Sequence, residues 1–318
     1  MVWLKRNVQL WGCFLLSMVA SMASDWPQFL GPSRDGVYPG ADVTREWTKS
    51  GPPVVWQKSV GQGFSGPVIA QGRLILFHRL NDQETIECLD SKTGKGLWSS
   101  DYPSSYRDDF GFDEGPRATP AIADGKVYTH GAEGTLTCVD FETGKKTWSI
   151  DTKKEFGWAK GFFGVACSPL VERDAVLLNI GGREGAGLVA FQKQTGKVLW
   201  KASNEEASYS SPVIGEFQGK RLALFLAKGS LLAADPANGN IAFSFPFRPP
   251  IRSSVTAAAP LVAGNYVFIS ASYGLGAALL ETDGSTVKKI WANDDSLSAH
   301  YTTSVHHNGY LYGIQRRS

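Results

Sequence analysis

One stretch of the sequence, residues 106–117, gathers carboxylates, arginines and aromatic side chains. Asp109, Asp113 and Glu114 could supply oxygen ligands to a calcium ion. Arg117 could instead pair with a carboxylate of a ligand. The spacing of the acidic residues does not match a known calcium loop, so a solvated loop with local ion pairs is the alternative. Long loops on a rigid scaffold often carry binding sites, and Asp109, Glu114 and Arg117 are therefore candidate ligand-binding residues of this acidic loop.

A second stretch, residues 156–164, is rich in glycine and aromatic residues. Trp158 within this aromatic loop could stack on a flat ligand or on a side chain of a partner. The aromatic loop follows Trp148 as the acidic loop follows Trp98, so both loops are expected on one face of the molecule. The alternative is that these aromatic side chains pack only against their own part of the chain.

Small hydroxyl residues precede a proline at three similar positions, and Ser168 is one of them, with Thr119 and Ser211. They are expected near the mouth of a central channel, with Arg117 and Tyr209 close by. Their hydroxyls could bond a ligand, or they could only keep crowded inner strands apart. A Ser/His/Asp arrangement cannot be assigned, because neighbours in space are unknown. We name no catalytic residue and no metal ligand.

The elements that must position these residues repeat along the chain. The unit is eleven residues long, Ala/Cys-x-Asp-x-x-Thr-Gly-Lys-x-x-Trp, and is clearest from Cys138 to Trp148. A period of about 45 residues is typical of propellers and solenoids. The copies begin at Cys88, Cys138, Ala190, Ala233 and Glu281, which are 50, 52, 43 and 48 residues apart. Four copies end in tryptophan, at Trp98, Trp148, Trp200 and Trp291, and the copy from Ala233 ends in Phe243.

Each unit has the chemistry of a β-hairpin. The Asp carboxylate can accept backbone N–H bonds in the turn, and the Gly supplies a positive φ. The Trp offers a large apolar face that only a neighbouring unit could cover. Two apolar runs precede each unit, so a repeat comprises four short strands, which is one propeller blade. We predict an all-β fold, a β-propeller of four-stranded blades over residues 54–318.

About six blades are represented in the sequence. Residues 54–57 resemble the last strand of a unit and are expected to close the ring. The final unit, from Thr303, lacks its third strand, its turn and its Trp. Because such a blade leaves unpaired strand edges, the last blade is expected to be incomplete and the coding sequence to continue past Ser318.

Residues 1–24 differ from the rest of the chain. Lys5 and Arg6 precede an apolar run, and small residues follow it, which predicts a secretory signal peptide; a transmembrane anchor is the alternative. We therefore expect a periplasmic or secreted protein, with no membrane span after cleavage. Residues 25–53 are rich in Pro and Gly and are expected to form an N-terminal surface segment, pinned by Trp26 and Phe29.

The composition excludes some partners. Of 32 basic residues, two lie in the leader, so the mature chain has 30 basic and 30 acidic residues. This balance does not favour nucleic acid or an anionic membrane surface as a partner. The remaining cysteines, Cys88, Cys138 and Cys167, are expected to be buried and unpaired, because Cys88 and Cys138 occupy the same place in successive units.

The repeated unit resembles the tryptophan-docking motif of the pyrroloquinoline quinone (PQQ) repeat β-propellers. This resemblance covers residues 54–318 and implies that Trp98, Trp148, Trp200 and Trp291 lock each blade onto its neighbour. Three shorter stretches, residues 115–120, 131–134 and 207–212, also resemble exported PQQ-like proteins of planctomycete-type bacteria.

The resemblance implies two kinds of function. Quinoprotein dehydrogenases oxidise alcohols or sugars with PQQ and calcium, and they resemble one another in a vicinal Cys–Cys disulfide that this sequence lacks. Other members, including the outer-membrane assembly lipoprotein of bacteria, use the ring as a protein-binding platform without a cofactor. Fold alone does not choose between them.

We expect an exported, non-catalytic binding or assembly scaffold whose ligand, a protein or a small molecule or carbohydrate, lies on one face of the ring. No cofactor is assigned, and PQQ with calcium remains open. One alternative is a PQQ-dependent dehydrogenase with Arg117, Glu114, Asp109 and Trp158 as the first residues to consider. The other is a carbohydrate-binding propeller that uses the aromatic loop.

Overall fold

The computed structural model describes residues 25–40, 46–251 and 254–315. The predicted signal peptide, residues 1–24, lies outside them. Each four-stranded sheet takes its strands from one continuous segment and places them in sequence order. All neighbouring strands are antiparallel, as hairpin connections require.

The sheets form six blades. Blade 1 comprises β1 (Val68–Ala70), β2 (Arg73–Leu80), β3 (Gln83–Asp90) and β4 (Gly96–Pro103), and blade 2 comprises β5 (Ala121–Ala123), β6 (Lys126–His130), β7 (Thr135–Asp140) and β8 (Lys146–Asp151). The helix α1 (Thr152–Phe156) follows blade 2. Blade 3 comprises β9 (Leu170–Glu172), β10 (Ala175–Asn179), β11 (Leu188–Gln192) and β12 (Val198–Ala202), and blade 4 comprises β13 (Val213–Phe217), β14 (Lys220–Leu226), β15 (Ser230–Ala234) and β16 (Ile241–Pro246). Blade 5 comprises β17 (Leu261–Ala263), β18 (Tyr266–Ser270), β19 (Ala277–Thr282) and β20 (Val287–Asn293), and the sixth is a two-stranded hairpin of β21 (Val305–His307) and β22 (Tyr310–Tyr312).

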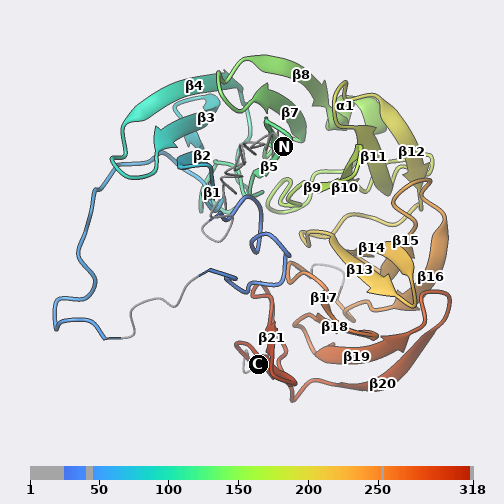
Figure 1. Ribbon diagram of the computed structural model, residues 1–318. Coiled ribbons are helices and arrows are strands. Elements are labelled where there is room, and N and C mark those ends of the chain that lie inside the picture. Colours follow the sequence, from blue (N-terminus) through green and yellow to red (C-terminus); the bar gives the residue numbers. More distant parts are fainter. Residues whose placement is uncertain (1–24, 41–45, 252–253, 316–318) are drawn as a thin grey trace, which may run out of the picture.

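The blades stand side by side around a common centre (Figure 1). Strands β1, β5, β9, β13 and β17 lie nearest the centre, and β4, β8, β12, β16 and β20 lie on the outside. The predicted all-β propeller of four-stranded blades is confirmed, with five such blades and a two-stranded sixth. No helix among the described residues has the length and apolar character needed to cross a bilayer.

The core lies between adjacent sheets. One cluster, for example, joins Leu136 and Cys138 of blade 2 to Val176, Leu178 and Phe191 of blade 3. Middle strands are buried on both faces, as in β10, whereas outer strands alternate between exposed and partly buried residues, as in β4. This difference follows from position, because an outer strand has one edge and part of its surface in water. The described cysteines Cys88, Cys138 and Cys167 are buried and free, as expected.

Each motif tryptophan of the first three blades reaches the next blade. The Trp98 indole donates from Nε1 to the carbonyl oxygen of Phe141 at 3.0 Å. It also lies over Gly144, where an added Cβ would come within 2.4 Å of the ring. The motif glycine therefore has two roles, since it adopts φ +70° and leaves room for the indole. The same arrangement places Trp148 on Lys193 and Gly196, and Trp200 on Pro236 and Gly239.

Trp291 lies in a different environment. Its ring packs on Phe268 of its own blade, with 6.1 Å between the ring centroids, and it belongs to a cluster that includes Leu311 of β22. In the first three blades, the indole docks on the turn that follows the third strand of the next blade. The described part of the sixth blade contains only two strands, β21 and β22, and so does not include that turn.

The predicted strand at residues 54–57 is not present. These residues form no strand, and Val54 and Val55 are 79% and 80% exposed. Trp56 nevertheless occupies the place of a docking tryptophan. Its Nε1 donates to the carbonyl oxygen of Ser91 at 3.0 Å, and its ring lies over Gly94. The indole contact is thus present although residues 54–57 form no β-ladder with a neighbouring strand.

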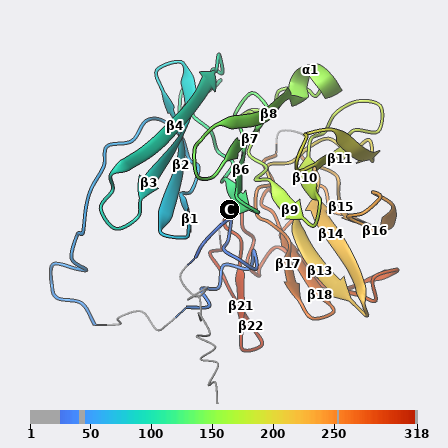
Figure 2. The same cartoon turned by 45° about the horizontal axis from the view of Figure 1, so that its top comes forward.

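The N-terminal segment lies against the hub of the ring. Trp26 exchanges backbone hydrogen bonds of 2.8 and 2.9 Å with Ile69 of β1. The buried Arg34 donates to the carbonyl oxygen of Pro169, just before β9, at 2.8 Å. Phe29 packs against the core cluster of blades 4 and 5. In the tilted view of Figure 2, this blue segment lies near the middle of the ring, and α1 lies at the upper edge.

Candidate functional site

A pocket of about 470 Å³ lies on the axis of the ring, and equivalent residues of the six blades line it. Each of these residues stands four positions before the first residue of its innermost strand. They are Phe64, Arg117, Ala166, Tyr209, Ala257 and Tyr301, which precede Val68, Ala121, Leu170, Val213, Leu261 and Val305. Phe112, Phe163 and Val255 complete the wall. The N-terminal segment contacts the chain farther along than these lining residues, at Ile69 of β1 and at Pro169 just before β9.

The cation in the axial pocket is neutralised. Arg117 pairs with Asp108 at 2.8 Å, and the side chains are 9% and 0% exposed. The guanidinium also lies over the rings of Phe64, Tyr106 and Phe163, 5.4 to 5.6 Å from their centroids. Burial opposes ionisation of Asp108, but N–H bonds in its own loop and the Arg117 charge outweigh it and lower the pKa of the carboxyl. The pocket therefore presents hydrocarbon and aromatic surface around a charge that already has its partner.

The acidic and aromatic loops meet at this pocket. Lys160 of the aromatic loop pairs with Asp109 of the acidic loop at 2.6 Å. Phe110 packs on Phe163 with 5.6 Å between ring centroids, and the Phe163 backbone N–H donates to the Tyr209 hydroxyl at 3.2 Å. Burial raises the pKa of that hydroxyl. Both loops thus lie on one face, where they wall the pocket together.

Arg79 of β2 holds the acidic loop in place, although it lies outside that loop. It is 2% exposed and donates to the backbone carbonyls of Ser104, Tyr106 and Glu114 at 3.2, 2.7 and 3.0 Å. A buried guanidinium with several carbonyl acceptors fixes both ends of a loop in one geometry. The sequence analysis did not identify Arg79. Its place in the largely apolar strand at residues 73–80 could have indicated a buried arginine with a structural role.

The remaining predicted residues lie apart from the axial pocket. Glu114 is partly exposed and faces Arg107 at 3.4 Å. Trp158 is 8% exposed, and its Nε1 donates to Thr152 at 3.2 Å. Asp109 borders a neighbouring groove together with Lys160. Of the predicted ligand-binding residues, only Arg117 and Tyr209 line the axial pocket.

Ser168 belongs to a hydrogen-bonded belt between blades. Its hydroxyl accepts the Thr119 backbone N–H at 2.9 Å, and its own N–H donates to the Ser211 hydroxyl at 2.9 Å. Gly66 donates to Thr119, and Ala259 to Thr303, in the same way. These residues stand two positions before each innermost strand, so the hydroxyls satisfy buried backbone groups where the inner strands converge.

The carboxylates near the axial pocket do not fit a calcium–quinone pair. Asp108 bonds Arg117, and Asp109 bonds Lys160. Asp113 accepts the Gly115 N–H at 2.7 Å. Within the described ranges, no three His, Cys, Asp or Glu side chains gather where a metal ion could be held. Calcium needs several free oxygen ligands, and a quinone tricarboxylate needs cations that are not already paired.

The fold is similar to three solved structures. BamB from Moraxella catarrhalis matches with a TM-score of 0.54 and 17% identity, over 79% of this chain and 69% of that chain. The quinohemoprotein alcohol dehydrogenase from Comamonas testosteroni matches with a TM-score of 0.58 and 16% identity, over 91% of this chain and 52% of that chain. A europium-containing methanol dehydrogenase has a TM-score of 0.54 and 14% identity, over 77% and 63% of the two chains. At these identities the likeness is one of fold, and the chain spans only about half of the Comamonas enzyme.

The sequence itself gives a more specific match. No curated protein matches it. A family model described as outer membrane protein assembly factor BamB matches residues 82–318, well over half of the chain. The repeated unit and the docked indoles agree with that match. The chain therefore belongs to the PQQ-like repeat β-propeller family that this model describes.

Proposed function

We propose that this protein is an exported, non-catalytic binding scaffold that takes an apolar side chain of a protein partner into the axial pocket. The observation that carries the proposal is the pocket's lining. Aromatic and small apolar residues from all six blades face a space of about 470 Å³, and its one arginine is paired with Asp108.

The chemistry of this lining favours an apolar anchor over a charged ligand. An anion would have to compete with Asp108 for a guanidinium that aromatic rings already cover. A cation would approach that guanidinium without a free carboxylate to receive it. Aromatic-lined, largely desolvated pockets are where anchor side chains contribute most to protein–protein affinity. The rim supports the same assignment, since Phe112 and Tyr301 are 70% and 58% exposed.

The experiment first identifies the partner. A photo-crosslinking amino acid at Tyr301, on the rim, is compared with the same label at Tyr266, an exposed residue of β18 outside the pocket. A partner captured only through position 301 is then purified and titrated against the wild-type protein. The variant Ala257→Trp fills the pocket and should weaken affinity at least tenfold, whereas Ala263→Trp on β17 should leave it unchanged.

Two outcomes contradict the proposal. One is a partner that binds Ala257→Trp as tightly as wild type. The other is saturable binding of PQQ in the presence of calcium, accompanied by dye reduction with alcohols, because that would make the protein a dehydrogenase. The same titration with PQQ and calcium therefore belongs to the experiment.

A further inference from the structure

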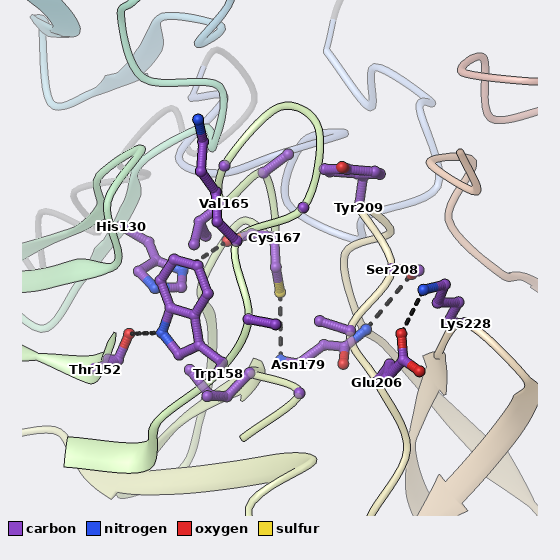
Figure 3. A pocket seen from close by; sticks show the side chains of 18 residues that line it. His130, Thr152, Trp158, Val165, Cys167, Asn179, Glu206, Ser208, Tyr209 and Lys228 are labelled. Atoms are coloured by element: carbon purple, nitrogen blue, oxygen red, sulfur yellow. Dashed lines mark hydrogen bonds and ion pairs between the residues drawn. The ribbon is translucent and has the colours of Figure 1, made fainter. Parts of the chain in front are cut away.

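A second pocket, of about 190 Å³, is lined by residues of blades 2, 3 and 4 (Figure 3). His130, Trp158 and Asn179 line its interior, and Lys160, Glu206 and Lys228 line it from more exposed positions. Its volume corresponds to roughly six water molecules. Ala166 and Tyr209 line both pockets, so this interblade pocket adjoins the axial pocket.

His130 offers a hydrogen-bond acceptor to this pocket. The side chain is 1% exposed, and Nδ1 lies 3.2 Å from the carbonyl oxygen of Cys167. A carbonyl oxygen only accepts, so Nδ1 carries the hydrogen and Nε2 has a free lone pair. Burial lowers the pKa of His130 to about 4, which keeps the ring neutral near pH 7. Nε2 has no hydrogen-bond partner within the part of the chain that the structure describes.

Asn179 offers a second acceptor. Ser208 donates its hydroxyl hydrogen to the carbonyl oxygen of Leu226, so its oxygen can only accept from Asn179. The Asn179 amide nitrogen faces that oxygen at 3.5 Å, which turns Oδ1 to the other side. Asn179 is 3% exposed, and Oδ1 also has no partner among the described residues. Two buried acceptors are thus held in fixed orientations by contacts on their far sides.

The other walls are apolar or already satisfied. Trp158 uses its Nε1 on Thr152, so it presents its indole ring as hydrocarbon surface. Val165 and Ile180 add to that surface. Glu206, the one carboxylate among the lining residues, pairs with Lys228. A buried cation would therefore lack a free counter-charge, and a wholly apolar occupant would leave both acceptors unpaired; either is unfavourable.

We propose that the interblade pocket binds a neutral polyhydroxylated ligand, either a single sugar ring or the terminal sugar of a glycan. Sugar hydroxyls donate to His130 Nε2 and Asn179 Oδ1, and the C–H face of the ring packs on Trp158. The ion pair of Glu206 and Lys228, with Lys160, leaves polar groups near the entrance for the remaining hydroxyls. This site is independent of the axial pocket and does not require its proposed function.

The test is titration of the purified protein with D-glucose, D-galactose, D-mannose and N-acetyl-D-glucosamine, by calorimetry and by saturation-transfer NMR. At least one sugar is expected to bind saturably. Asn179→Leu removes an acceptor at similar volume, and Ala207→Leu fills the half-exposed wall; each should weaken binding at least tenfold. Ala263→Leu, at a half-exposed alanine of β17, should leave the affinity unchanged.

Each other outcome overturns the proposal. No saturable binding by any of the four sugars means that the pocket holds only water. Wild-type affinity in either folded Leu variant, checked by its unfolding midpoint, places the sugar elsewhere. Ala257→Trp, which fills the axial pocket, should not change sugar affinity. A loss in that variant would assign the sugar to the axial pocket, and failure of one proposal is thereby distinguished from failure of the other.

Discussion

Arg117 and Asp108 form an ion pair of 2.8 Å in which neither side chain has more than 9% of its surface exposed. The pair links the two ends of the acidic loop, and Phe64, Tyr106 and Phe163 surround the guanidinium. It therefore sets both the shape and the charge of the axial pocket.

Breaking this pair should destabilise the protein. Asp108→Asn leaves a largely buried guanidinium without its counter-charge, and we expect a loss of roughly 2–3 kcal/mol in the free energy of unfolding. Asp109→Asn, one residue later, removes an exposed pair with Lys160 and should cost less than about 1 kcal/mol. Urea denaturation of both variants measures the difference. Equal stabilities would contradict the structural role of the buried pair.

The docking glycines offer a test of the interface between blades. Gly144→Ala should cost roughly 3 kcal/mol, because the Cβ displaces the Trp98 indole in addition to straining a positive φ. Gly125 has the same φ of +70° but no atom within 4 Å of its Cβ position, so Gly125→Ala should cost only about 1–2 kcal/mol. Thermal and urea unfolding compare the two variants. If both variants lose the same amount of unfolding free energy, the Trp98 indole does not pack against the Gly144 turn.

Trp56 should contribute to stability although it lies in no strand. Removing its indole exposes Gly94 and leaves the Ser91 carbonyl without its donor, so Trp56→Ala should cost roughly 2–3 kcal/mol. Trp47 is 63% exposed, and Trp47→Ala is the matched control, with an expected change within about 0.5 kcal/mol. If Trp56→Ala has the same unfolding midpoint as Trp47→Ala, Trp56 does not act as a docking tryptophan.

His130 should make stability depend on pH below neutrality. Its pKa falls from 6.5 to about 4 in the folded protein because of burial. Between these values the unfolded chain binds a proton that the folded chain does not, so stability is complete above pH 6.5 and declines toward pH 4. The whole shift corresponds to about 3 kcal/mol.

His130→Gln removes this titration, so the free energy of unfolding should depend less on pH between pH 6.5 and pH 4. His307→Gln, at an exposed imidazole, is the control. Unfolding free energies measured at intervals from pH 7 to pH 4 make the comparison. A wild-type slope that persists unchanged in His130→Gln would assign the pH dependence to another group, such as His78, whose pKa is also lowered mainly by burial. Glu84 cannot be that group, because burial raises its pKa and its contribution to stability therefore increases as the pH falls.

The sequence by itself determined the repeating hairpin and with it the blades. The reason is that the turn chemistry is local. Asp90 accepts the Thr93 N–H at 2.8 Å, and Asp140 accepts the Thr143 N–H at 3.0 Å. These contacts span three residues and need no partner from elsewhere. The number of motif copies and their spacing then predicted the number of blades, and the motif's residues indicated the family.

Only the tertiary structure decided which distant residues share a site. The six residues of the axial pocket stand up to 237 positions apart, from Phe64 to Tyr301, and no pattern of side-chain types marks them as a set. Arg79, buried far from the loop in sequence, fixes that loop through backbone carbonyls. Ser168 was a candidate ligand-binding residue, yet its hydroxyl bonds the neighbouring blade. A ring brings equivalent positions together at its axis, and that closeness is a property of the packed sheets, whereas the sequence specifies only that the positions are equivalent.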